Sequence, residues 1–147
     1  MNREGIKQIL PHREPMLLVD EAELVDGVAV GLYTVRGDEF FLRGHFPDNA
    51  VVPGVMLCEM MGQAACLLID GMGEGSTPYF TGLDKVRFKR KVLPGDTVVS
   101  RCELVRSKPP FHFIRGQAFV KDELCAGAEL SFAVMADAPM EEGNDVR

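Results

Sequence analysis

The composition of this chain describes an ordinary globular protein with one domain. Its 147 residues are 46% hydrophobic and 26% charged, the balance of a domain that folds around its own core. The net charge of −6 argues against a general nucleic-acid-binding protein, although it leaves room for a local basic patch.

Cysteine and histidine spacing gives no sign of a disulfide framework or a metal site. The four cysteines have no CxxC spacing, and the three histidines lie far apart in the sequence. We interpret the cysteines as small buried hydrophobic residues in a reducing compartment. Because no HxxxH, HExxH or Cys/His cluster occurs, we expect no metal.

The N-terminus MNREGIKQIL is polar and lacks the apolar core of a signal peptide. The apolar run over 55–69 is too short to span a membrane, and it contains Glu59 and Gln63. We therefore expect a cytoplasmic protein without a membrane span.

The first third of the chain predicts a short helix, two strands and a long loop. The helix lies within 2–10 and ends before a proline. Strands are predicted over 15–25 and 27–37, with an Asp-Gly turn signal between them. Two prolines and two glycines make 39–54 irregular, and a loop of that length is often functional.

The remainder predicts one long helix followed by strands. Good helix formers fill 55–69, Pro53 suits a first helical turn, and glycines follow the run. Strand-like runs occupy 97–107, 111–120 and 123–134, joined by hairpin connections. A polar tail from about 136 to 147 is expected to fray. These elements predict an α+β fold in which a sheet wraps one buried helix, and its uncovered surfaces predict self-association.

Glu59 is the one charged side chain in that helix. A carboxylate in apolar surroundings is costly unless it is paired, and Gln63, one turn later on the same face, can hold it by a hydrogen bond. Two interpretations stay open from the residues alone. Glu59 is either a functional acid or a structural carboxylate that caps a backbone group or bridges a subunit contact.

His45 and the start of the helix offer a base and hydrogen-bond donors. The sequence GHFP combines a glycine with a stiffening proline, and a rigid loop that presents an imidazole suits general base catalysis. The amides of Gly54 and Val55 lie at the positive end of the helix and can stabilise an oxyanion. The alternatives are a structural histidine and ordinary helix initiation.

Together these groups match the needs of enolate chemistry. Removal of a proton α to a thioester requires a base and a polarised carbonyl. Loss of a β-hydroxyl requires a proton donor, because hydroxide is a poor leaving group. His45, the Gly54 amide and Glu59 can fill these three roles in that order.

The sequence resembles the beta-hydroxyacyl-acyl-carrier-protein dehydratases of type II fatty acid synthesis in three segments, LPHREPMLLVD, GHFPDNAVVPGVMLCEMMGQAA and YFTGLDKVRFKRKVLPGD. The resemblance extends from about Ile6 to about Val134. It implies the hotdog fold, an antiparallel sheet wrapped around one long central helix, as a single domain over 1–147. It also implies a homo-oligomer, a dimer that assembles into a trimer of dimers.

The same resemblance implies roles for individual residues. His45 and Glu59 would form a catalytic dyad contributed by opposite subunits, so that the active site lies at the dimer interface. The Gly54 amide would bind the thioester carbonyl, with Val55 as a second donor. Further substrate-binding residues would be Gln63, a gating Tyr79 and the tunnel-lining Phe46, Pro47, Val52 and Met56. No metal or nucleotide cofactor is implied, because the 4'-phosphopantetheine arm belongs to the carrier protein.

The segment 85–91, KVRFKRK, holds five cations in seven residues. It is either a solvated strand edge or a docking patch for the acidic acyl carrier protein. The candidate docking residues are Arg87, Lys89, Arg90 and Lys91. His12 and Arg13 can be structural, and the sequence does not decide their role.

The sequence therefore predicts a lyase that converts (3R)-3-hydroxyacyl-[acyl carrier protein] into the trans-2-enoyl product in fatty acid elongation. Glu59 favours dehydration without isomerisation, since the related dehydratase-isomerases carry aspartate there. One alternative is a hotdog thioesterase that uses the same helix terminus. A second is a non-catalytic acyl-binding subunit, which would bind the carrier without turnover.

Overall fold

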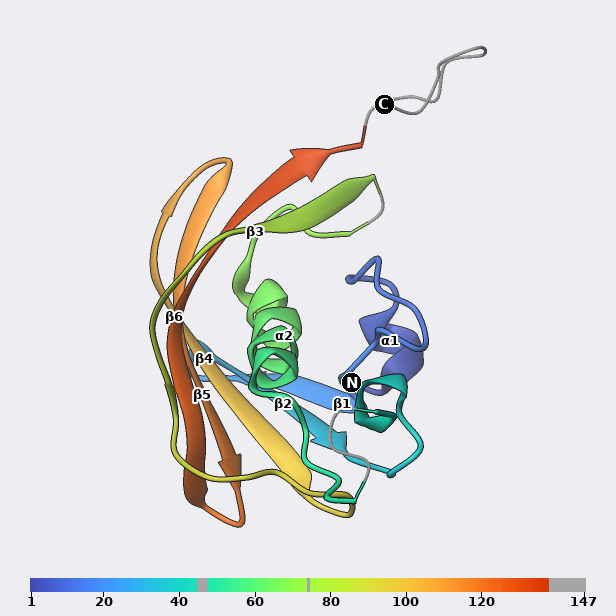
Figure 1. Ribbon diagram of the computed structural model, residues 1–147. Coiled ribbons are helices and arrows are strands. Elements are labelled where there is room, and N and C mark those ends of the chain that lie inside the picture. Colours follow the sequence, from blue (N-terminus) through green and yellow to red (C-terminus); the bar gives the residue numbers. More distant parts are fainter. Residues whose placement is uncertain (45–47, 74, 138–147) are drawn as a thin grey trace.

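A computed structural model describes residues 1–44, 48–73 and 75–137. One antiparallel sheet curves around a central helix, with a short N-terminal helix at its open side (Figure 1). In chain order the elements are α1 (Arg3–Ile6), β1 (Glu21–Val25), β2 (Val28–Thr34), η1 (Phe40–Leu42), α2 (Gly54–Ala65), η2 (Cys66–Leu68), β3 (Ser76–Phe88), β4 (Thr97–Lys108), β5 (Phe111–Val120) and β6 (Glu123–Ala136).

The sheet has six strands in the order β1-β2-β4-β5-β6-β3, and every neighbouring pair is antiparallel. The turn between β1 and β2 contains Asp26 and Gly27, with φ of 49° and 80°. The turn between β5 and β6 contains Lys121 and Asp122, with φ of 50° and 64°. Two successive left-handed residues give the turn that matches the twist of a tight hairpin.

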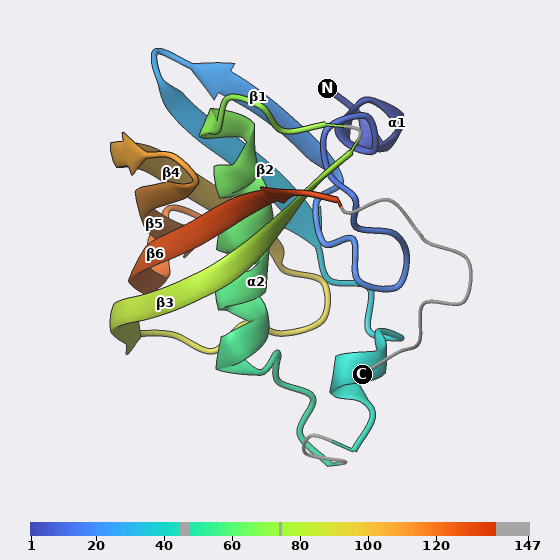
Figure 2. The ribbon, with the colours of Figure 1, turned by 90° about the horizontal axis from the view of Figure 1, so that it is seen from above.

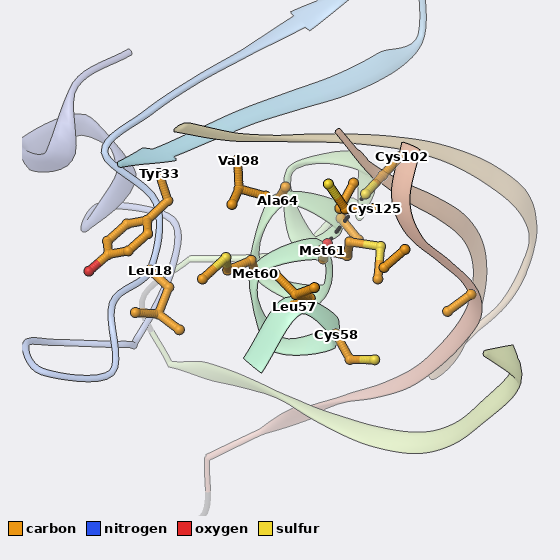
Figure 3. Close-up of a cluster of buried hydrophobic side chains, with 14 of the residues drawn as sticks. Leu18, Tyr33, Leu57, Cys58, Met60, Met61, Ala64, Val98, Cys102 and Cys125 are labelled. Carbon is orange, nitrogen blue, oxygen red and sulfur yellow. Dashed lines mark hydrogen bonds between the residues drawn. The ribbon is translucent and has the colours of Figure 1, made fainter. Parts of the chain in front are cut away.

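Helix α2 lies inside the curve of the sheet, and strands β3 and β6 cross it obliquely (Figure 2). Met60, Met61, Ala64 and Ala65 are each at most 1% exposed. Figure 3 shows Met60, Met61 and Ala64 on α2 among side chains such as Val98 and Cys102 of β4. The thiol of Cys102 donates to the carbonyl oxygen of Met61 at 3.3 Å. The apolar surface of α2 is therefore enclosed on most sides, as the sequence predicted.

The cysteines are core residues. All four are free and buried, which confirms their interpretation as small hydrophobic side chains. Burial raises the pKa of the Cys102 thiol to about 12 and raises that of Cys66 further. Within the described part of the chain, no helix has the length and apolar character needed to cross a membrane.

Two regions differ from the predicted elements. The predicted strand 15–25 is wrong in its first part, since β1 begins at Glu21. The amide of Leu18 donates to the side chain of Gln63 at 2.8 Å instead of to a neighbouring strand. Strand β3 was not predicted as an element, although 85–91 was considered as a strand edge. It forms the edge of the sheet beside β6, most of its residues are exposed, and its register shifts twice. The predicted tail lies outside the described residues apart from Ala136 and Asp137.

Close packing between β2 and α2 gives a first prediction. A Cβ atom at Gly31 would lie 2.9 Å from the Cβ of Ala64, so Gly31→Ala must push strand and helix apart. We expect a loss of about 1–3 kcal/mol in the free energy of unfolding, measured by urea denaturation. Gly127→Ala is the matched control, because the nearest atom to its added Cβ is 3.8 Å away. Equal stability of the two variants would contradict the prediction.

Candidate active site around Glu59

Glu59 lies in the middle of α2 and faces the loop that follows α1. Its side chain is 21% exposed, while Cys58 and Met60 beside it are 3% and 1% exposed. The carboxyl group is therefore sheltered by the protein and still accessible from one side. A carboxyl group in this position requires hydrogen-bond donors from the protein.

Gln63 donates a hydrogen bond to the Glu59 carboxyl group. Its Nε2 donates to Glu59 Oε2 at 2.8 Å and to the carbonyl oxygen of Met16 at 2.7 Å. Its Oε1 accepts from the amide of Leu18 at 2.8 Å. Gln63 is 1% exposed, so these bonds satisfy a buried amide on both sides. The expected hydrogen bond between Gln63 and Glu59 is confirmed.

His12 also faces Glu59, which the sequence did not predict. Its Nε2 lies 3.5 Å from Glu59 Oε2. Its Nδ1 is buried and has no hydrogen-bond partner among the described residues. Burial lowers the pKa of His12, Glu59 partly opposes this shift, and Arg13 adds to it. The sequence signal was present in the segment LPHREP, but nothing in that segment pointed to a carboxyl group on a distant helix.

The N-terminus of α2 borders a cavity of about 530 Å³. The first helical hydrogen bond runs from the amide of Met56 to the carbonyl oxygen of Pro53 at 2.9 Å. Gly54 and Val55 precede it, where amides have no partner within the helix. A Cβ at Gly54 would lie 2.8 Å from ring atoms of Phe88, so glycine here lets that ring pack against the helix. The cavity is lined by Val51, Val52, Gly54, Val55, Leu57, Phe88, Lys89, Arg90, Lys91 and Val92.

The structure thus groups the predicted residues into two sets, one in the middle of α2 and one around its N-terminus. Gln63 joins Glu59, whereas Val52, Gly54 and Val55 share the cavity with three of the four basic candidates. Tyr79 lies on edge strand β3 and is 56% exposed. Met56 is partly buried and packs against the core. His45, Phe46 and Pro47 lie outside the described residues.

The basic segment is partly paired within the chain. Arg90 lies 3.8 Å from Asp96 and 3.4 Å from Glu123, whereas Arg87, Lys89 and Lys91 are exposed. The exposed three are therefore better placed to meet a partner than Arg90 is. Among residues 1–44, 48–73 and 75–137, no group of three or more His, Cys, Asp and Glu side chains could hold a metal ion.

Glu39 is a further residue that the sequence did not single out. It is 8% exposed and accepts from Tyr33 Oη at 2.7 Å, from the amide of Arg36 at 2.9 Å and from the amide of Gly37 at 2.8 Å. It directly precedes η1, which leads toward the segment that contains His45. Glu39 thereby fixes the start of this connection to the end of β2.

The sheet around a single helix, with a sheltered carboxyl group on that helix, defines the class of this protein as an α+β hotdog fold. The ApeI:P dehydratase heterocomplex of Xenorhabdus doucetiae matches with a TM-score of 0.74 at 19% identity, over 87% of this chain and 89% of that chain. At that identity the match shows the fold alone.

The sequence comparisons define the family. Residues 10–129 match the FabA-like domain. The 3-hydroxyacyl-[acyl-carrier-protein] dehydratase FabZ of Clostridium perfringens is 41% identical over 91% of this chain and 99% of its own length. The enzyme of the same name from Staphylococcus haemolyticus is 43% identical over 88% and 92%, respectively. The chain therefore belongs to the 3-hydroxyacyl-[acyl-carrier-protein] dehydratase family, as its motifs predicted.

The buried amide of Gln63 gives a second prediction. Gln63→Leu removes the acceptor of the Leu18 amide and the donor to Glu59 and Met16, and leaves these groups unpaired. We expect a loss of about 1–3 kcal/mol in the free energy of unfolding, measured by urea denaturation. Gln117→Leu on β5 is the control, because Gln117 is exposed and should change stability by less than about 0.5 kcal/mol. A Gln63→Leu protein with the free energy of unfolding of wild type would show that these hydrogen bonds contribute little to stability.

Glu39 gives a third prediction, on pH dependence. Burial alone would raise the pKa of Glu39, but the bonds from Arg36, Tyr33 and Gly37 outweigh it and hold the pKa below its usual 4.5. A carboxyl group with a lowered pKa stabilises the folded state above its unfolded pKa, and this contribution disappears as the pH falls through the folded pKa. The stability difference between wild type and Glu39→Gln should therefore be constant from about pH 5 to 7 and shrink below about pH 4.

Urea unfolding of both proteins between about pH 3 and 7 measures this difference. Glu103→Gln serves as an exposed control. A difference that stays constant down to the lowest pH would contradict the role given to Glu39.

Proposed function

We propose that this protein removes water from a (3R)-3-hydroxyacyl chain on acyl carrier protein and gives the trans-2-enoyl product in fatty acid elongation. The observation that carries this proposal is Glu59, a carboxyl group held by Gln63 in the middle of an apolar helix. Membership of a dehydratase family supports the reaction type, and the two relatives described above are named for this reaction.

In the proposed mechanism, His45 takes the proton from the carbon α to the thioester. The electron pair forms the new double bond as the bond from the β-carbon to oxygen breaks. Glu59 delivers its proton to the departing hydroxyl, which leaves as water. The Gly54 amide, with Val55 as a second donor, stabilises negative charge on the thioester oxygen during proton removal. His45 then returns its proton to solvent, and Glu59 is protonated again for the next turnover.

The substrate is proposed to enter at the cavity beside the N-terminus of α2. That cavity borders Gly54 and Val55 and carries the cationic side chains of Lys89 and Lys91. Positive charge at its mouth suits an acidic carrier protein, because opposite charges speed encounter and orient the partners. Tyr79, Val52, Met56, Phe46 and Pro47 remain the proposed acyl-contacting residues. No cofactor is needed, and we place the enzyme in the cytoplasm.

A dimer is part of the proposal. Strand β3 forms one edge of the sheet and exposes Tyr79, Phe80, Leu83 and Phe88 by 40–56%. An exposed apolar edge strand favours pairing with a second copy. In such a dimer His45 of one subunit would meet Glu59 of the other, and three dimers would form the hexamer.

The fourth prediction tests the proposed acid and base. Glu59→Gln and His45→Ala should each lower kcat/KM by about 10²–10⁴-fold, measured as enoyl formation from a 3-hydroxyacyl carrier thioester by mass spectrometry. Glu103→Gln, an exposed carboxyl variant on β4, should keep wild-type activity.

The same assay distinguishes the alternatives. Release of free thiol without the enoyl product would indicate a hotdog thioesterase. Tight carrier binding without any product would indicate an acyl-binding subunit. Full activity of Glu59→Gln would exclude Glu59 as the acid.

A further inference from the structure

His12 and Glu59 form a pair at the edge of the proposed site. The distance from His12 Nε2 to Glu59 Oε2 is 3.5 Å, and the two side chains are 22% and 21% exposed. This distance exceeds that of a good hydrogen bond. Contacts in active sites without substrate are often long and shorten when substrate binds. No step of the proposed mechanism involves His12.

Hydrogen bonds hold the chain on both sides of His12, within its own segment on one side and to helix α2 on the other. The guanidinium of Arg13 donates to the carbonyl oxygens of Leu10 at 2.8 Å, His12 at 2.7 Å and Lys7 at 3.2 Å. At the other end, Gln63 bonds the backbone of Met16 and Leu18. The backbone around His12 is therefore held by hydrogen bonds that do not involve the contact between the imidazole and Glu59.

The environment of the ring indicates which nitrogen carries the proton. Nδ1 is buried without a partner among the described residues, and a buried N–H without an acceptor costs free energy. A cationic ring would place an N–H there, and burial also lowers the pKa of His12. The favoured form is a neutral imidazole with its proton on Nε2, the nitrogen that faces Glu59.

Within the described part of the chain, both nitrogen contacts of the Glu59 carboxyl group go to the same oxygen. Gln63 Nε2 and His12 Nε2 each approach Glu59 Oε2. An oxygen that accepts from two N–H groups is a poor site for the acidic proton. When Glu59 is protonated, the proton therefore lies on the other oxygen, Oε1.

We propose that His12 is a positioning residue that, together with Gln63, binds Glu59 Oε2 and so directs the protonated Oε1 toward the departing hydroxyl of the substrate. This inference rests on the proposed function, since it assigns a partner to the proposed acid. His12 acts through Glu59 and transfers no proton itself. It assists the proton-donation step, so its loss should affect kcat more than KM.

The fifth prediction uses three substitutions of His12. The amide nitrogen of Gln can reach the place of the imidazole Nε2, the amide nitrogen of Asn can reach only that of Nδ1, and Ala offers neither. We expect His12→Ala and His12→Asn to lower kcat about 10- to 100-fold with little change in KM. His12→Gln should stay at least about tenfold above His12→Ala. Glu14→Gln is the control, because Glu14 lies in the same loop and contacts Arg3 and Lys7 instead of Glu59.

A double variant tests whether His12 acts through Glu59. In a Glu59→Gln background, His12→Ala should cause no further loss of kcat, because a positioning residue has no effect once its acid is removed. Thermal unfolding of every variant shows whether the fold is kept. The inference is overturned if His12→Ala retains wild-type kcat, or if a folded His12→Gln protein is as slow as His12→Ala. It is also overturned if His12→Ala slows the Glu59→Gln enzyme further.

Crystal structures of wild type and His12→Ala keep this inference separate from the proposed function. A Glu59 side chain that turns to another rotamer in the variant supports the positioning role, whatever reaction the protein performs. An unmoved carboxyl group overturns it. Wild-type protein that forms no enoyl product would overturn the proposed function alone.

Discussion

The site depends on one buried amide, the side chain of Gln63. It binds the carboxyl group of Glu59 on its own helix and two backbone groups of the loop around Met16 and Leu18. A single planar group therefore fixes the carboxyl group and the loop that brings His12 to it. A buried polar network of this kind is stable only when each member has a partner. Because the partners of Gln63 come from the folded loop, the fold sets the position of the Glu59 carboxyl group.

The sheet explains why the carboxyl group can lie there at all. Strands β2, β4, β5 and β6 pack against α2 and bury its apolar faces, while the face that carries Glu59 and Gln63 meets an irregular loop. A loop offers free backbone groups, whereas a strand within the sheet has already paired its own. The failure of residues 15–20 to form a strand is therefore what provides hydrogen-bond partners for Gln63.

Sequence reasoning succeeded where the signal is local. A run of helix formers marked α2, strand-like runs marked β4 to β6, and the four-residue spacing of Glu59 and Gln63 predicted their hydrogen bond. It failed where tertiary packing decides. The amide of Leu18 donates to the side chain of Gln63, far along the sequence, instead of to a strand. Strand β3 has too few buried residues to show an alternation of apolar and polar side chains. His12 lies beside Glu59 in a loop that Gln63 of α2 binds at Met16 and Leu18, and no local sequence pattern contains that information.

In the proposed reaction one helix holds both electrophilic groups. Glu59 follows Gly54 by five residues, which is about 7.5 Å along the axis at a rise of about 1.5 Å per residue. Five residues also turn the helix by about 140° at about 3.6 residues per turn, so the Glu59 side chain leaves α2 on a different face from Gly54, and Glu59 does not line the cavity that Gly54 borders. A single copy of α2 therefore does not bring both groups to one cavity, which agrees with the proposal that the active site forms between two subunits. In that dimer the acid must still be held at the correct rotation to meet the departing hydroxyl, which is the proposed task of Gln63 and His12.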